Sequence, residues 1–295
     1  MVYTSVFAGL SAALCWGTAD YLSRSQSERI GYYKTVVYSH VVTLVVLLAL
    51  VPFISPNLTF PAYPVLVLIG AGCLNFIAFI FLYRAFHRGV VSVVAPIAYT
   101  YPAVTTVLSV VILGTFLSVT QALIIAGIIF GVILLSTRFS ELRASFKGSG
   151  KPNLTRGVDS ALGSSTFFGM VYVGVGYAAP LVNVILPAMV LRVVVPVLGI
   201  LFAPVLKQQL RPSRSIFSKT MITIGVIEAV GFLSFTYGIS AAGGSLPIVA
   251  ALSGMGGAVA ASYGLAFLGE RLEPNQVLGV VLSLAGVFTL LYLGG

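Results

Sequence analysis

Arg192 and Glu228 are the two ionisable residues that lie deepest inside long apolar runs of the sequence. Each lies about ten residues from the nearer end of its run, so at about 1.5 Å per residue both reach the middle of a helix that crosses a membrane. A charge at that depth costs about 2.5–3.5 kcal/mol on insertion scales, and it faces an interior partner or a water-filled cavity. Three roles are open: Arg192 binds a substrate carboxylate, Glu228 exchanges a proton for coupling, or the two form a structural ion pair.

Two further polar side chains, Asn75 and His40, also lie within apolar runs. Asn75 is a candidate for contact with a solute in a central cavity, or for a hydrogen bond between helices, which contributes about 1 kcal/mol or less. His40 has a ring that changes charge near neutral pH, so it is a candidate for substrate binding or coupling. The alternative for His40 is an interhelical hydrogen bond.

Two apolar runs combine residues that perturb helices with side chains that could line a cavity. Interrupted helices at corresponding positions of two halves are the best sequence indication of a transporter's binding site. The expected helix-break positions are Pro96, Pro102, Pro247 and Gly257. The side chains that we expect in the cavity wall beside them are Tyr99, Trp16, Tyr172 and Ser253. An aromatic wall suits apolar or aromatic solutes and an ammonium group.

The composition indicates the fold class in which these side chains lie. Of 295 residues, 58% are apolar and 8% are charged, and the mean hydropathy is +1.07. Soluble domains have roughly 45–50% apolar and about 25% charged residues. Membrane β-barrels show weak alternating segments of about 10 residues, whereas the apolar runs here are unbroken. The sequence therefore predicts an all-α integral membrane protein.

Gly, Pro and charge clusters divide the chain into ten expected transmembrane helices. Their ranges are 2–23, 33–54, 64–84, 89–112, 117–137, 157–178, 182–206, 217–239, 244–268 and 274–293. Fifteen of the sixteen basic residues fall in the odd-numbered loops, and the remaining one is Arg192. By the positive-inside rule the odd loops are cytoplasmic and both termini are extracytoplasmic.

The polar segment 138–156 is therefore expected to be a cytoplasmic linker between the two halves of the chain. Asp20 lies near a cytoplasmic helix end, where pairing with Arg24 explains it.

The two halves of the chain resemble each other in sequence. Trp16-Gly17 matches Phe168-Gly169 and His40 matches Arg192 at a shift of 152, while Gln121 and Gly131 match Gln276 and Gly286 at 155. By the local shift, Asn75 matches position 229, next to Glu228. Each half, 1–137 or 157–295, contains five helices, and because five is odd the second repeat must be inverted. Inverted repeats with a site at their interface are typical of secondary transporters.

The repeated motifs also resemble a known family. Tyr83-Arg84-Ala85, Ala95-Pro96 and Leu113-Gly114, with Leu268-Gly269-Glu270-Arg271 in the second half, are similar to the EamA-type branch of the drug/metabolite transporter superfamily. The resemblance covers essentially the whole chain. It implies a ten-helix basket, alternating access and, commonly, export of amino acids or related metabolites, with aromatic amino acid exporters among the members. Thr115 stands where the second half has Glu270, and His40 where the family often has arginine.

These features together predict a secondary transporter of a small metabolite, with an amino acid or related compound and the export direction favoured. A passive facilitator or channel of the same fold is the main alternative. An intramembrane enzyme is disfavoured, since the sequence has no H-E-x-x-H motif and its two histidines, His40 and His87, both lie in the first third of the chain. The sequence also has no G-x-x-x-x-G-K-[ST] loop, so we expect transport to be driven by substrate or ion gradients rather than by ATP. We expect no cofactor, no metal and no nucleic acid. The expected partners are the solute, the lipid of a bacterial-type plasma (inner) membrane and, as a coupling ion, protons. A monomer and a homodimer both remain open.

Overall fold

A computed structural model describes residues 2–54, 58–88, 97–137, 139–140, 142–143, 157–210, 218–241, 244–256, 259, 263 and 273–293. These residues form ten α-helices and one short 3₁₀-helix. The helices of the first half are α1 (Val2–Ile30), α2 (Tyr32–Ile54), α3 (Ala62–Arg88), α5 (Tyr101–Leu113) and α6 (Val119–Ser136). Those of the second half are α8 (Val158–Ala178), α9 (Leu186–Phe202), α10 (Lys219–Ser240), α11 (Leu246–Ser253) and α13 (Pro274–Leu293), with η1 (Ala179–Leu181) before α9. Each α-helix corresponds to one expected transmembrane segment, so the all-α fold class is confirmed.

Two kinds of boundary differ from the prediction. Helix α1 runs to Ile30 rather than residue 23, because polar residues continue the helix beyond the apolar run until Gly31, at φ 86°, ends it in the left-handed region. The expected helices 89–112 and 244–268 contain turns at 99–100 and 254–255, so α5 begins after the first turn and α11 ends before the second. Hydropathy locates an apolar run but does not show where hydrogen bonding along that run is interrupted.

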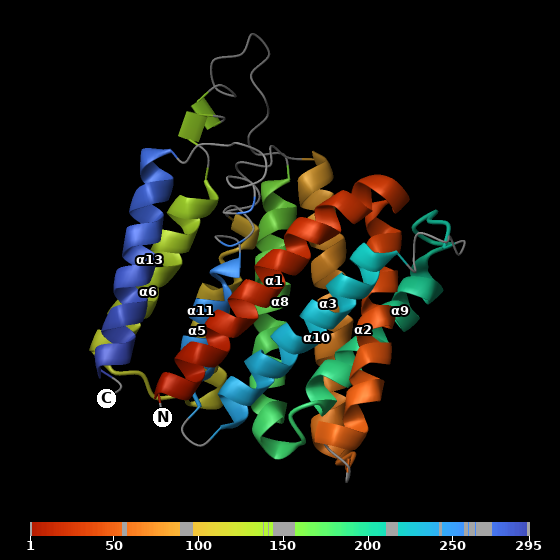
Figure 1. Cartoon of the computed structure of the whole chain (residues 1–295), viewed down its shortest axis with the longest axis horizontal. Coiled ribbons are helices and arrows are strands. Elements are labelled where there is room, and N and C mark those ends of the chain that lie inside the picture. Colours follow the sequence, from red (N-terminus) through yellow and green to blue (C-terminus); the bar gives the residue numbers. More distant parts are fainter. Residues whose placement is uncertain are drawn as a thin grey trace.

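The second half repeats the first in the opposite direction. In Figure 1, α1 rises from the end of the molecule where both termini lie, whereas its counterpart α8 descends toward that end. Helices α6 and α13 form a separate antiparallel pair at one side (Figure 1). The helix contacts are reciprocal: α3 packs on α8 as α10 packs on α1, and α3 packs on α9 as α10 packs on α2. The structure therefore has two inverted five-helix repeats.

Close contacts at glycines show the same reciprocity at the level of residues. A methyl group added to Gly72 of α3 would lie 2.7 Å from Val194 Cβ of α9, and one added to Gly225 of α10 would lie 2.5 Å from Val42 Cγ1 of α2. Gly225 is the repeat counterpart of Gly72, and Val194 that of Val42. Each pair of crossing helices thus approaches through a glycine at equivalent places.

The starts of α6 and α13 are capped alike. Gln121 Oε1 accepts a hydrogen bond from the Ser118 backbone N–H at 3.1 Å, and Gln276 Oε1 accepts one from the Glu273 backbone N–H at 3.0 Å. Ser118 also accepts from the Gln121 N–H, which completes a capping box. The repeat match between Gln121 and Gln276 is therefore explained by a shared capping role.

We expect Gln121→Ala to lower the free energy of unfolding by about 1 kcal/mol, since it removes the reciprocal half of the capping box. The loss would appear as a lower midpoint of thermal unfolding in detergent. Gln208→Ala is the control, because the described hydrogen bond of the Gln208 side chain is an exposed 3.3 Å contact with the Leu206 carbonyl, two residues away. Equal midpoints for the two variants would show that the cap does not stabilise α6.

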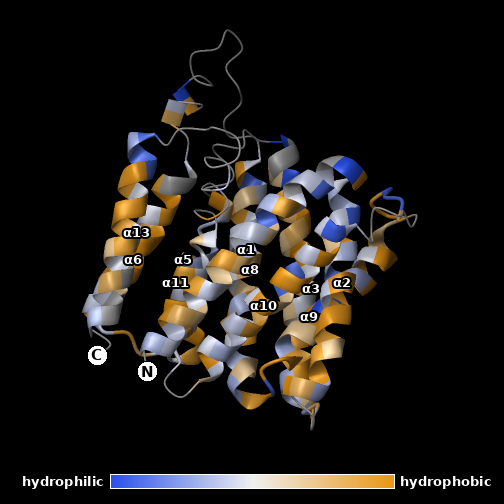
Figure 2. Cartoon of the chain, viewed as in Figure 1, coloured by the Kyte–Doolittle hydropathy of each residue, from blue (hydrophilic) through white to orange (hydrophobic). Residues whose placement is uncertain are grey.

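The hydropathy of the residues changes along each helix as expected for a membrane protein. Most helices are apolar along their middles, and hydrophilic residues gather at the end opposite the termini (Figure 2). Among the described residues, the segments Tyr32–Ile54, Ala62–Leu82 and Lys219–Ser240 are long and apolar enough to cross a membrane by length and composition. Shorter apolar helices include Leu186–Phe202 and Pro274–Gly286. The chain is a multi-pass membrane protein.

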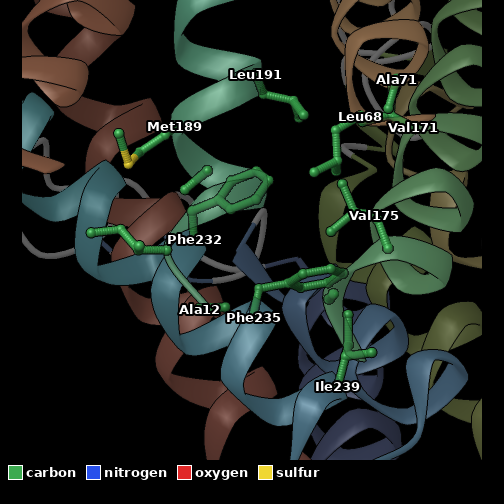
Figure 3. Packing of buried hydrophobic residues seen from close by; sticks show 14 of the residues in the cluster. Ala12, Leu68, Ala71, Val171, Val175, Met189, Leu191, Phe232, Phe235 and Ile239 are labelled. Atoms are coloured by element: carbon green, nitrogen blue, oxygen red, sulfur yellow. The ribbon is translucent and has the colours of Figure 1, made fainter. Parts of the chain in front are cut away.

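The largest buried cluster lies where α3, α8, α9 and α10 meet. Figure 3 shows Phe232 and Phe235 of α10 pointing toward Leu68, Val175 and Leu191 from the other helices. Phe235 and Leu191 are fully buried. This close packing fixes the helices that surround the polar residues of the interior.

Candidate functional site

A cavity of about 120 Å³ lies between the two repeats. At about 30 Å³ for each water molecule in the liquid, this space holds about four water molecules. Its described walls come from α1, α3, α5, α8, α9, α10, α11 and the turns beside α5 and α11. The lining residues are Trp16, Asp20, Asn75, Phe79, Leu82, Ala98, Tyr99, Tyr101, Phe168, Val171, Tyr172, Arg192, Glu228, Phe232, Ser253, Gly254 and Gly256.

Arg192 and Glu228 form an ion pair in the cavity wall. Arg192 Nη2 donates to Glu228 Oε2 at 2.6 Å, and the side chains are 5% and 23% exposed respectively. The Arg192 guanidinium carbon also lies 5.1 Å from the centre of the Phe232 ring, within the range of a cation–π contact. Arg192 Nε is buried without a hydrogen-bond partner in the described structure. The expected contact between these two residues is present, and it can serve either structure or transport.

Aromatic rings form a continuous wall beside the ion pair. The Tyr172 ring lies 5.7 Å from Trp16, 5.1 Å from Tyr101 and 4.9 Å from Phe235, centre to centre. Phe168 extends the wall, 6.2 Å from Tyr101. Such spacings are typical of packed aromatic pairs. Trp16 and Tyr172 thus lie where the sequence placed them, on the matched helices α1 and α8.

Asn75 and Ser253 add neutral polar groups to the wall. Asn75 is 5% exposed and its amide makes no hydrogen bond within the part of the chain that the structure describes. Ser253 Oγ donates to the Ala250 carbonyl at 2.9 Å, and the Ser253 hydroxyl is also hydrogen-bonded to the Tyr101 hydroxyl. Because Gly72 and Gly225 are equivalent and differ by 153 positions, the counterpart of Asn75 is Glu228 itself. The shift of 153 thus gives Glu228 as the counterpart of Asn75, whereas the sequence alignment gave position 229.

Turns interrupt the fourth and ninth expected helices at equivalent places beside the cavity. A turn at 99–100 precedes α5, and a turn at 254–255 follows α11; the two turns differ by 155 positions, the local shift of the repeat. Pro102 and Pro247 are in the first turns of α5 and α11, so they begin helices rather than break them. A methyl group at Gly254 would lie 2.6 Å from Pro102 Cγ, which shows that the two interruptions touch. Pro96 and Gly257 lie outside the described residues.

His40 is the one expected site residue that the described structure places away from the cavity. It is 5% exposed, its Nδ1 lies 2.8 Å from the Val36 carbonyl oxygen, and its ring meets Phe79 edge-on at 5.3 Å. A hydrogen bond to its own helix replaces the expected interhelical one. Arg192 is the repeat counterpart of His40, but its longer side chain reaches the cavity.

Asp20 is a lining residue whose place the sequence did not indicate. It lies one helical turn after Trp16 on α1, and Tyr99 Oη donates to Asp20 Oδ2 at 3.5 Å. The expected pairing with Arg24 concerns a side chain outside the described set. The signal that could have found Asp20 is its i, i+4 spacing from Trp16, which puts both side chains on one face of the helix.

Hydrogen bonds of one side chain tie α1 to α10 and α11 near the chain's N-terminus. Ser5 Oγ donates to the Gly238 carbonyl at 3.2 Å and accepts from the Ser245 N–H at 3.1 Å, which ties α1 to the ends of α10 and α11. The repeat counterpart of Ser5 is Gly157, which has no side chain to make this tie at the other end. The three charged residues of the cavity wall differ in exposure. Arg192 is 5% exposed and Glu228 is 23% exposed, whereas Asp20 is in the exposed class.

Comparison with known proteins agrees with this architecture. The model of the EamA-like transporter family matches residues 3–137 and 155–292. An uncharacterized protein of Methanocaldococcus jannaschii, MJ1333.1, is 29% identical over 133 residues, which are 45% of this chain and 96% of that protein. A solved structure described only as a crystal structure of a protein has a TM-score of 0.77 at 16% identity, covering 97% of this chain and 95% of the other. At that identity the likeness shows the fold alone.

The family match covers both inverted repeats, and the cavity lies between them. It agrees with the resemblance that the sequence motifs indicated. The chain therefore belongs to the EamA-like transporter family, and it is a multi-pass membrane transporter of small metabolites.

Proposed function

We propose that this chain is a secondary transporter that exports an amino acid or a related compound by alternating access of the cavity between its two repeats. The observation that carries the proposal is the cavity itself, which lies between the two inverted repeats and has charged and aromatic walls.

The charge distribution supports the export direction. The basic residues of the odd-numbered loops assign those loops to the cytoplasm by the positive-inside rule, so the termini are outside. With that orientation Asp20, which lies on α1 beyond the middle of the helix, is the charged wall residue on the cytoplasmic side. An exporter loads its substrate from this side.

The first test is a thermal-shift screen of the purified protein against amino acids, nucleosides and sugars, because a ligand that binds only the folded state raises its apparent stability. Hits are then measured by counterflow in proteoliposomes. An alternating-access carrier accelerates uptake of labelled solute when unlabelled solute is inside. Uptake without this trans-stimulation would identify a facilitator of the channel type and contradict the proposal.

Glu228→Gln tests whether protons are the coupling ion. If Glu228 carries the proton, the variant should lose accumulation driven by a pH gradient but keep counterflow, because exchange at equal pH needs no proton transfer. The measurement is uptake against external pH in the same proteoliposomes. Unaltered transport with an unaltered pH profile would exclude the coupling role.

A further inference from the structure

Among the described side chains that line the cavity, the charges do not balance. Arg192 and Glu228 neutralise each other at 2.6 Å. Asp20 has no cationic partner among the described side chains, and its described hydrogen bond is the 3.5 Å contact from the Tyr99 hydroxyl. The cavity therefore has one carboxylate whose charge its described walls leave uncompensated, at the exposed end.

We propose that Asp20 binds the ammonium group of the transported solute, which makes the substrate class small amines that carry an aromatic or apolar group. This inference rests on the proposed transport function and names the group by which the solute is recognised. A protonated amine supplies the positive charge that the described walls do not offer to Asp20, and its N–H groups donate to the carboxylate.

Trp16 gives the ammonium group a second partner. Residues 16 and 20 are four apart on α1, so the indole and the carboxylate line the same side of the cavity. Tryptophan has the ring that binds cations best. Tyr99, which holds one oxygen of Asp20, adds another aromatic ring at this end.

The remainder of the solute would meet the aromatic wall. Behind Trp16, the Tyr172 ring stacks 5.1 Å from Tyr101, and both rings line the cavity. This surface favours an aryl or alkyl group.

Arg192 is poorly placed to bind a substrate carboxylate in this state. Its Nη2 is held by Glu228 and its guanidinium group lies over Phe232, so an incoming carboxylate would compete with Glu228. A carboxylate on the solute is then tolerated but not required, whereas the amine is required.

Phenethylamine, phenylalanine and 3-phenylpropionate test the assignment, because they share a phenyl ring and differ in their charged groups. Binding to the full-length protein in detergent is measured by thermal shift, and transport by counterflow of labelled phenethylamine. We expect phenethylamine and phenylalanine to bind and 3-phenylpropionate not to bind. Asp20→Asn should weaken phenethylamine binding about tenfold or more, the loss expected for a charge-assisted hydrogen bond.

Asp159→Asn is the matched control, since Asp159 is an exposed carboxylate in the first turn of α8 and does not line the cavity. Asp20→Glu keeps the charge and should retain selectivity for the amine. If Asp20→Asn does not fold, the comparison of the three compounds on the wild-type protein still decides the matter.

Binding of 3-phenylpropionate as tight as that of phenethylamine, or full phenethylamine affinity in Asp20→Asn, would overturn the assignment. If phenethylamine and phenylalanine both fail to bind while another solute shows trans-stimulated counterflow, the amine assignment is wrong and the transport proposal stands. If no solute shows counterflow, the transport proposal fails as well.

Discussion

Alanine at Gly17 should destabilise the protein and abolish transport. A methyl group at this position would overlap the backbone oxygen of Gly256, and it would lie 2.6 Å from Val259 Cβ. A backbone carbonyl cannot rotate away as a flexible side chain does, so α1 must move off the segment that follows α11. Overpacking of this kind costs about 1–3 kcal/mol or more, and it would displace Trp16 and Asp20 from the cavity wall. The measurements are the midpoint of thermal unfolding and uptake into proteoliposomes.

Gly127→Ala is the control for this substitution. Gly127 lies in α6, and a methyl group there would meet no other atom within 4 Å. Since glycine inside a helix is less stable than alanine by roughly 0.5–1 kcal/mol, Gly127→Ala should raise the midpoint slightly. If Gly17→Ala were as stable as Gly127→Ala, the close approach of α1 to Gly256 would be disproved.

Removing one member of the Arg192–Glu228 pair should have the second large effect. Arg192→Met leaves the Glu228 carboxylate in the protein interior without its 2.6 Å partner, and loss of one partner of a buried pair costs about 3–5 kcal/mol. The double variant Arg192→Met, Glu228→Leu has no uncompensated charge, and it should recover most of the lost stability. Thermal unfolding of the single and double variants measures this directly.

Transport by the double variant then separates the two roles of the pair. If the pair only locks α9 to α10, the double variant should transport as the wild type does. If the pair takes part in coupling, stability returns but driven transport does not. Arg29→Met is the control, because Arg29 is an exposed cation in the last turn of α1 and does not line the cavity. Equal stability of the single variant Arg192→Met and this control would contradict the burial of the pair.

The fold could be predicted from the sequence because its signals are local. Unbroken apolar runs define the helices, and the match between Gln121 and Gln276 marks a cap that each repeat must form. The Arg192–Glu228 contact could be predicted too, since only a few charges lie at membrane depth and neighbouring helices bring these two together. The depth of a residue in the membrane follows from its distance along the helix, and that distance can be counted in the sequence.

The remaining parts of the site depend on contacts between distant segments. Proline and glycine predicted an interruption in each of two apolar runs, but not that the turns lie at 99–100 and 254–255, where Gly254 packs against Pro102. His40 and Arg192 occupy equivalent positions, yet a ring bonded to Val36 stays out of the cavity and a longer side chain reaches it. Asp20 looked like a helix-end residue because the apolar run ends near residue 23. In the structure α1 continues past the end of that run to Ile30.

The inversion of the two repeats has an electrical consequence. Each α-helix carries a dipole along its axis, positive at its N-terminus, and every helix of the first repeat has a counterpart that runs the opposite way. The dipoles of α6 and α13, or of α1 and α8, therefore largely cancel across the membrane. The backbone then contributes little to voltage dependence, and the membrane potential acts on the charges that move, at about 2.3 kcal/mol per elementary charge for each 100 mV. A solute that enters as a cation and leaves as a cation would feel that potential in full.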